Sequence, residues 1–220
     1  AQNYDARTFR KEKIKNKIQL QKDLGLEQDP KAMMIGIVSR LTDQKGFDLI
    51  AYIMDELCQD AVQIVALGTG EERYENMFRH FDWKYHGKVS AQIYYDEAMS
   101  HRIYAASDAF LMPSLFEPCG LSQLMSLRYG TVPIVRETGG LKDTVIPYNE
   151  YTKEGTGFSF ANYNAHEMLA TIRYALSVFY QHKNDWDILI KHGMSQDFSW
   201  NASVAEYEKL YDSLMTKFTW

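Results

Sequence analysis

The sequence reads Ser114-Leu115-Phe116-Glu117-Pro118-Cys119-Gly120-Leu121-Ser122-Gln123-Leu124 directly after the apolar run Asp108-Ala109-Phe110-Leu111-Met112. The apolar run predicts a strand and the pattern after Gly120 predicts a helix, so a lone carboxylate, Glu117, falls at a strand-to-helix junction. Pro118 ends the strand, and Gly120 allows the backbone to approach a ligand closely. Because the N–H groups at a helix start can bind phosphate, the stretch suits a ligand with hydroxyls at one end and phosphate at the other, such as a sugar nucleotide.

Apolar runs and helical patterns alternate along the rest of the chain. Strands are expected at 33–38, 62–67, 89–95, 108–112, 132–135 and 157–160, and helices at 6–24, 49–57, 71–80, 97–106, 120–129, 164–182, 184–193 and 202–218. Strands that alternate with helices in units of roughly 25 to 35 residues imply right-handed crossovers and a parallel sheet. We expect an α/β fold, with a Rossmann-like parallel sheet covered by helices on both faces and followed by C-terminal helices.

Three parts of the chain are predicted from this pattern. They are a leading helix and linker at 1–28, the Rossmann-like domain at 29–182, and a C-terminal helical extension at 183–220. The leading helix is polar, and its only apolar stripe consists of Ile14, Ile18 and Leu20 or Leu24. Its charged start at residue 1 is more typical of an excised piece than of a natural beginning.

Composition excludes several classes of protein. A formal net charge of -5 argues against a general nucleic-acid binder. The sequence contains no apolar run of about 18 residues, so we expect no transmembrane helix and no membrane partner. No signal peptide is recognisable, and two cysteines cannot form a disulfide framework, so we expect a cytoplasmic protein.

Four polar segments follow predicted strands and are expected at one edge of the sheet, where α/β proteins bind ligands. They are 39–46, 68–70, 114–121 and 136–141. Arg40 and Lys45 flank a turn before a helix, where two cations could stabilise a diphosphate leaving group. From their spacing alone, solvated surface cations are an equal alternative. Gly139-Gly140 before another helix could form a further backbone anion site.

Other kinds of site fit the sequence less well. Gly68-Thr69-Gly70 begins like a dinucleotide fingerprint, but Arg73 replaces the third glycine and the segment follows the second strand. No Walker A pattern occurs. The six histidines show no zinc spacing, and Asp185 and Asp187, two apart on a predicted helix, face different ways, so no metal site is expected.

Two further side chains could contact a ligand. Cys119 lies beside Glu117 without a neighbouring histidine, which favours a packing or ligand-contact role over a nucleophile. Tyr94 and Tyr95 end the third strand, and one of them could stack on a base while the other packs in the core.

Three motifs in this order resemble the family of bacterial glycogen synthases and plant starch synthases: 39–46, 116–121 and 138–145. The similarity extends to Ser100-His101-Arg102-Ile103 and Phe198-Ser199-Trp200. The resemblance implies the GT-B architecture, in which two Rossmann-like domains face a cleft, and this chain resembles the C-terminal one. The N-terminal domain, with its Lys-x-Gly-Gly-Leu loop and acceptor site, would be missing, and the extension at 183–220 would pack back toward it.

The same resemblance implies transfer of glucose from ADP-glucose to the non-reducing end of an α-1,4-glucan, with retained configuration and with no metal or other cofactor. Arg40 and Lys45 would hold the diphosphate, and Glu117 would bind glucose hydroxyls. Tyr95 would lie near the adenine. The substrate-binding positions implied are Ser39, Tyr95, Cys119, Gly120, Leu121, Thr138, Gly139 and Gly140.

The resemblance also narrows the choice of function. Many retaining glycosyltransferases carry a second glutamate where this chain has Met125, and glycogen and starch synthases tend to lack it. The isolated domain is expected to have little or no transferase activity, because half of the cleft is absent. A non-catalytic nucleotide-sugar-binding module is the alternative, and the choice between ADP-glucose and UDP-glucose stays open. A sugar-nucleotide epimerase fits the cleft but not the Glu-Pro-Cys-Gly-Leu run.

Overall fold

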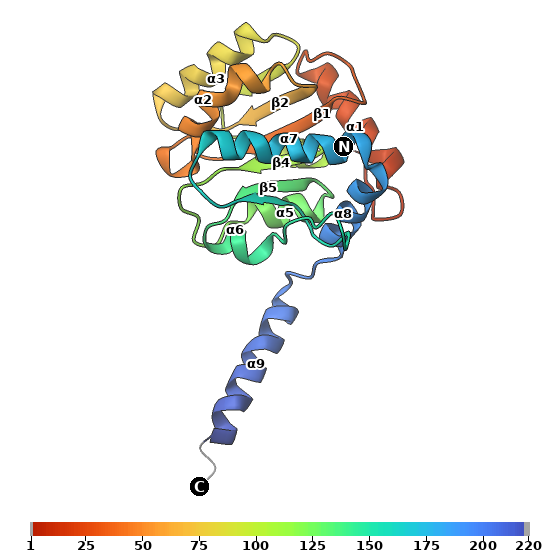
Figure 1. Cartoon of the computed structure of the whole chain (residues 1–220), viewed down its shortest axis with the longest axis vertical. Helices are drawn as coiled ribbons and strands as arrows, with labels where there is room; N and C mark the ends of the chain where they lie inside the picture. Colours follow the sequence, from red (N-terminus) through yellow and green to blue (C-terminus); the bar gives the residue numbers. More distant parts are fainter. Residues whose placement is uncertain (1, 218–220) are drawn as a thin grey trace.

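The computed structural model describes residues 2–217, and it contains a six-stranded sheet in the order β3-β2-β1-β4-β5-β6 (Figure 1). Every neighbouring pair of strands is parallel. The strands are β1 (Met33–Val38), β2 (Val62–Leu67), β3 (Val89–Gln92), β4 (Ala109–Met112), β5 (Val132–Arg136) and β6 (Phe158–Phe160). The predicted α/β class with a parallel sheet is confirmed.

Helices connect the strands and cover both faces of the sheet. They are α1 (Phe9–Asp23), α2 (Phe47–Leu57), α3 (Glu72–Lys84), α4 (Glu97–Ala106), α5 (Ser122–Arg128), α6 (Gly139–Thr144), α7 (Ala165–Gln181), α8 (Lys183–Ser195) and α9 (Trp200–Lys217), with a short 3₁₀ turn at Asp43–Lys45. Within 2–217 the predicted helices are all present, with ends shifted by a few residues, and the predictions for residues 1 and 218–220 lie outside the described residues. β3 is shorter than expected, so Tyr94 and Tyr95 lie beyond it.

The core lies on both sides of the sheet because successive strand residues point to opposite faces. In β1, Ile35 packs in the cluster that contains Ile53 of α2 and Ile172 of α7. Its neighbour Met34 faces the other way, into the cluster that contains Leu20 and Ile103. Burying each such side chain contributes roughly 1.5–3 kcal/mol, which explains the almost continuously apolar sequence of the central strands.

The buried face of α1 is largely polar, which differs from its predicted apolar stripe. Ile14 is 44% exposed and Ile18 is 37% exposed, whereas Leu20 is buried as expected. The side chains of Lys13, Asn16, Lys17 and Gln21 are buried beside Phe9 and Leu20 instead. The apolar pattern is only partly kept because the surface that α1 covers includes backbone carbonyls and a carboxylate, which select hydrogen-bond donors, beside the apolar groups that contact Phe9 and Leu20.

Lys13 and Lys17 satisfy those acceptors. Nζ of Lys13 donates to the carbonyls of Tyr104 and Tyr129, at 3.1 and 3.2 Å, where α4 and α5 end and where a cation is favoured. Nζ of Lys17 lies 2.5 Å from Oδ2 of Asp108, and that oxygen also accepts from the N–H of Met34 at 2.7 Å. Helix α1 therefore joins the amino ends of β1 and β4.

The predicted boundary at residue 183 falls between two helices that pack together. Trp186, Leu189 and Ile190 of α8 are buried in the same cluster as α7 and the sheet, so α8 shares the core of the Rossmann-like domain. Helix α9 instead stands away from the sheet (Figure 1), with Trp200 85% exposed. None of the helices described at 2–217 is long and apolar enough to cross a bilayer.

The buried ammonium of Lys13 predicts a pH-dependent stability. Burial lowers the pKa of Lys13 to about 7, against the smaller raising effect of Asp108. The unfolded chain then binds the proton more tightly than the folded chain above this pH, so stability should rise with pH. We expect the free energy of unfolding of the native chain, relative to that of Lys13→Met, to increase by about 1 kcal/mol per pH unit between pH 7 and about pH 9. Urea unfolding of both proteins across this range measures the difference. A difference that does not change with pH would show that Lys13 stays charged.

Candidate functional site

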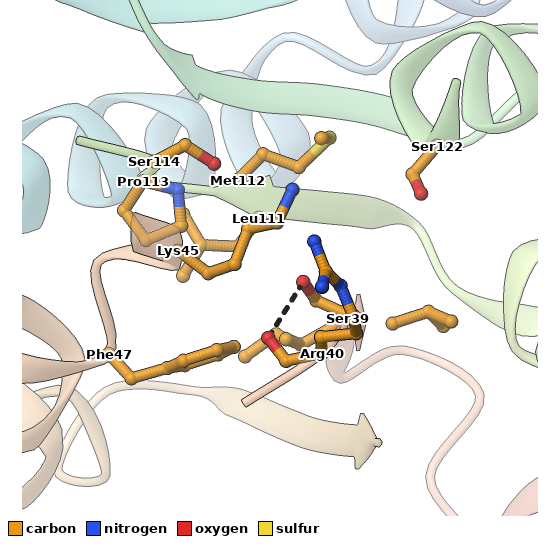
Figure 2. A pocket seen from close by; sticks show the side chains of 11 residues that line it. Ser39, Arg40, Lys45, Phe47, Leu111, Met112, Pro113, Ser114 and Ser122 are labelled. Atoms are coloured by element: carbon orange, nitrogen blue, oxygen red, sulfur yellow. Dashed lines mark hydrogen bonds between the residues drawn. The ribbon is translucent and has the colours of Figure 1, made fainter. Parts of the chain in front are cut away.

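The loops after β1 and β4 enclose a pocket of about 180 Å³ at the carboxyl ends of these strands (Figure 2). The strand order reverses between β1 and β4, and this switch point is where open α/β sheets bind ligands. Arg40 follows β1, Lys45 ends the 3₁₀ turn, Ser114 follows β4 and Ser122 begins α5. The structure thus brings together the two predicted cations and the stretch that carries Glu117.

Arg40 and Lys45 supply the positive charge of this pocket. Figure 2 shows the ends of their side chains converging on the same space from different sides. Nζ of Lys45 forms an ion pair of 2.5 Å with Oε2 of Glu117. Arg40 is exposed and has no ion-pair partner within residues 2–217, so its guanidinium is available to an anion in the pocket.

Glu117 is 7% exposed, and its position is fixed by two donors. Besides Lys45, the hydroxyl of Ser114 lies 3.2 Å from the same Oε2. Because removing one partner of a buried ion pair leaves an uncompensated charge, Lys45 and Glu117 hold each other in place. The pair also couples the loop after β1 to the loop after β4.

Hydrogen bonds reinforce this coupling along the backbone. The backbone carbonyl of Gln44 accepts from the N–H of Leu115 at 2.9 Å. The side-chain amide of Gln44 donates to the carbonyl of Phe116, also at 2.9 Å. From β5, Nη1 of Arg136 donates to the carbonyls of Leu115 and Ser114, at 2.7 and 3.3 Å. The segment before Glu117 is therefore held from both neighbouring strands.

Gly139 and Gly140 pack directly on the backbone around Glu117. A Cβ at Gly139 would lie 2.1 Å from the carbonyl oxygen of Glu117, and one at Gly140 would lie 1.9 Å from that of Cys119. The N–H of Gly140 donates to the Glu117 carbonyl at 3.1 Å. Only glycine permits this close approach, so the two glycines place the start of α6 against the Glu117 loop.

The other predicted binding residues lie at different distances from the pocket. Ser39 lines it, and its hydroxyl donates to the carbonyl of Arg40 at 3.2 Å (Figure 2). Cys119, Gly120, Leu121 and Thr138 lie in the two loops just described, and Leu121 is 62% exposed. Tyr95 is 85% exposed in the loop after the edge strand β3 and is not among the residues that line the pocket, so its place near an adenine stays a prediction.

Sequence reasoning overlooked four side chains that build the site: Gln44, Ser122, Gln123 and Arg136. All lie within or beside the segments at the strand ends. Only their position beside the predicted motifs could have identified them. A side chain that supports a loop through contacts with its backbone belongs to no sequence motif.

The glycine-rich segment at 68–70 supports the neighbouring loop. A Cβ at Gly68 would lie 1.9 Å from the carbonyl oxygen of Ser39, and the N–H of Leu41 donates to the carbonyl of Thr69 at 2.9 Å. The segment thus packs against the loop that carries Arg40. This close packing accounts for the glycines at 68 and 70 without a dinucleotide-binding role.

Asp185 and Asp187 have separate partners. Asp185 accepts from the hydroxyl of Tyr148 at 2.6 Å and pairs with Lys153 at 2.8 Å, and these two donors lower its pKa. Asp187 pairs with Arg10. In the part of the chain that the structure describes, no three His, Cys, Asp or Glu side chains are grouped as metal ligands.

A parallel sheet with helices on both faces and a charged pocket at its switch point defines a Rossmann-like domain. The chain matches the family of glycosyl transferases group 1 over residues 17–186, and it belongs to this family. It is 72% identical over 212 residues to a glycogen synthase of Lachnospira eligens, covering 96% of this chain and 44% of that protein. A glycogen synthase of Lachnoclostridium phytofermentans is 63% identical over 211 residues, with 96% and 44% covered.

A solved structure agrees with these relatives. The catalytic domain of starch synthase IV from Arabidopsis thaliana, described as bound to ADP and acarbose, superposes with a TM-score of 0.87 at 35% identity, covering 96% of this chain and 44% of that one. The predicted resemblance to glycogen and starch synthases is confirmed. The chain spans less than half the length of the relatives that it matches.

The close packing of Gly140 generates a prediction for ligand binding. Gly140→Ala should push the start of α6 away from Cys119, destabilise the chain by about 1–3 kcal/mol and lower its affinity for ADP. Gly25→Ala is the control: Gly25 has a φ of 69°, which strains alanine, but no atom lies within 4 Å of a Cβ there, so this change should lower stability without moving either loop of the pocket. Calorimetric titration with ADP, together with urea unfolding, measures both effects. Equal ADP affinity in the two variants would show that the contact between the loops is not needed for binding.

Proposed function

We propose that this chain is the donor-binding half of a glycogen synthase, which transfers glucose from ADP-glucose to the non-reducing end of an α-1,4-glucan with retained configuration. The single observation that carries the proposal is the pair of cations, Arg40 and Lys45, that line one pocket at the switch point, with Lys45 held by an ion pair to Glu117. Its support comes from the similarity to glycogen synthases and to a starch synthase described as bound to ADP.

The two cations would act on the leaving group. As the bond between glucose and diphosphate breaks, negative charge builds on the diphosphate, and cations already in position stabilise it without reorganisation. Arg40, which has no carboxylate partner in the described residues, would bind the diphosphate directly. Lys45 would share its ammonium between Glu117 and the diphosphate, so the ion pair orients it for this role.

Glu117 would recognise the donor sugar. Both of its protein contacts use Oε2, so the carboxylate is held at one oxygen while the other can accept from glucose hydroxyls. The backbone of Gly120, Leu121, Gly139 and Gly140 would surround the glucose-diphosphate portion. Holding the sugar on one face of the site is what a retaining transfer requires.

The acceptor would bind outside this chain. The chain covers 44% of the glycogen synthases that it matches, and we assign the glucan site to the remaining part of such a protein. We infer that residues 1–220 alone bind ADP-glucose without transferring glucose, and that the transfer needs no metal.

Arg40 gives the first test, in the full-length enzyme. Arg40→Ala should lower turnover with ADP-glucose by about 2–4 kcal/mol of barrier, because a charge contact in the transition state is lost. Arg79→Ala, which removes a surface cation paired with Glu75 on α3, is the control and should leave turnover unchanged. Steady-state kinetics measures both. Unchanged kinetics in Arg40→Ala would exclude the guanidinium from the diphosphate role.

Binding to the chain itself gives the second test. Titration of residues 1–220 with ADP, UDP and their glucose esters should show binding of ADP and ADP-glucose in preference to the uridine compounds. Glucan elongation by this chain should be absent, whereas the full-length enzyme should elongate glucan equally with and without EDTA. Preference for UDP would overturn the donor assignment, and loss of turnover in EDTA would overturn the metal-free mechanism.

A further inference from the structure

Gln123 is a fully buried amide beneath the candidate donor site. It lies in the first turn of α5 and is 0% exposed. Its Nε2 donates to the carbonyls of Cys119 and Gly120, both at 3.0 Å, and to the hydroxyl of Thr144 at 3.2 Å. Two acceptors from the loop before α5 and one from the end of α6 therefore surround one amide nitrogen.

The orientation of this amide is determined by its surroundings. If the amide were flipped, Oε1 would face three oxygen atoms and the hydrogen bonds to both carbonyls would be lost. In the orientation observed, Oε1 has no hydrogen-bond partner among residues 2–217. It packs against Gly120, where an added Cβ would lie only 2.4 Å from it. A buried acceptor without a partner is unfavourable, so the donor side of the amide provides the compensating interactions.

The contacts of Gln123 continue from one loop to the other. The hydroxyl of Thr144, which accepts from Gln123, donates to the carbonyl of Gly140 at 2.5 Å. The N–H of Gly140 in turn donates to the carbonyl of Glu117. The chain of contacts thus runs from Gly120 through Gln123 and Thr144 to Gly140, and it returns to the loop that carries Glu117.

We propose that Gln123 is a positioning residue for the donor site, which holds the backbone of Cys119 and Gly120 in register with the Gly139–Gly140 turn. This role rests on the proposed function, because the two loops matter only if they enclose the glucose-diphosphate portion of a donor. Gln123 does not touch the donor. It sets the direction of the backbone groups that do, and a displacement of about 1 Å in such groups can lower a rate by about a hundredfold.

Two substitutions test the role in the full-length enzyme. Gln123→Met keeps the length of the side chain but removes the N–H groups that donate to Cys119, Gly120 and Thr144. The kcat/KM for ADP-glucose should therefore fall about ten- to a hundredfold. At neutral pH, Gln123→Glu places a carboxylate, which can only accept hydrogen bonds, against the oxygens of Cys119, Gly120 and Thr144. Burial and these oxygens favour the protonated carboxyl, which donates again at lower pH. The activity of Gln123→Glu relative to the native enzyme should therefore rise as the pH falls from about 8 to about 6.

Gln63→Met is the matched control. Gln63 is also a buried glutamine, 3% exposed, and its amide donates to the carbonyl of Glu27 at 2.6 Å, near the start of β2 and away from the pocket. It should lose stability like Gln123→Met but keep the native kcat/KM and pH profile. Urea unfolding of all variants separates stability from positioning.

Each outcome decides the role. Native kcat/KM in Gln123→Met, an equal loss in Gln63→Met, or a pH profile of Gln123→Glu parallel to the native one would each overturn it. If the native enzyme did not turn over ADP-glucose, the proposed function would be wrong, and this role would fall with it. Kinetics of the native enzyme show this before any variant is measured.

Discussion

Lys45 and Glu117 form an ion pair of 2.5 Å across the carboxyl ends of β1 and β4, and the geometry of the candidate site depends on it. The pair holds the loop after β1 against the loop after β4, so that Arg40 and Ser114 line one pocket. Neither charge is replaceable singly without leaving the other buried and unpaired. The same contact therefore serves the stability of the loops and the polarity of the pocket.

A second ion pair joins the same two strands at their other ends. Lys17 of α1 contacts Asp108, which directly precedes β4 and accepts from Met34 in β1. The central pair of strands is thus fixed by charge at both ends and by apolar packing between them. Charged contacts at the ends of buried strands satisfy backbone groups that apolar side chains cannot, which is why α1 buries lysines rather than isoleucines.

Helix α9 stands away from the sheet (Figure 1), and it exposes Trp200, Val204 and Leu210. The relatives that this chain matches are more than twice as long as the matched part. Packing of the extension at 183–220 against the rest of such a protein stays a prediction, and the exposed apolar side chains of α9 are the surface with which it would be made.

The sequence by itself determined the parallel sheet, because the apolar runs of the central strands and the glycines and polar residues after them leave few other folds. It also determined that Arg40, Lys45, Glu117 and Gly139-Gly140 belong to one edge, since parallel strands end on the same side. Only the tertiary structure decided which of these residues meet. The strand order places β1 beside β4, so Lys45 reaches Glu117, whereas Tyr95 follows the edge strand β3 and does not line the pocket. The polar face of α1 was also decided there, because the carbonyl of Tyr104 that Lys13 contacts is 91 positions away in the sequence. The two carbonyls that Gln123 contacts are close to it in sequence, but only the fold brings Thr144 of α6 to the same amide.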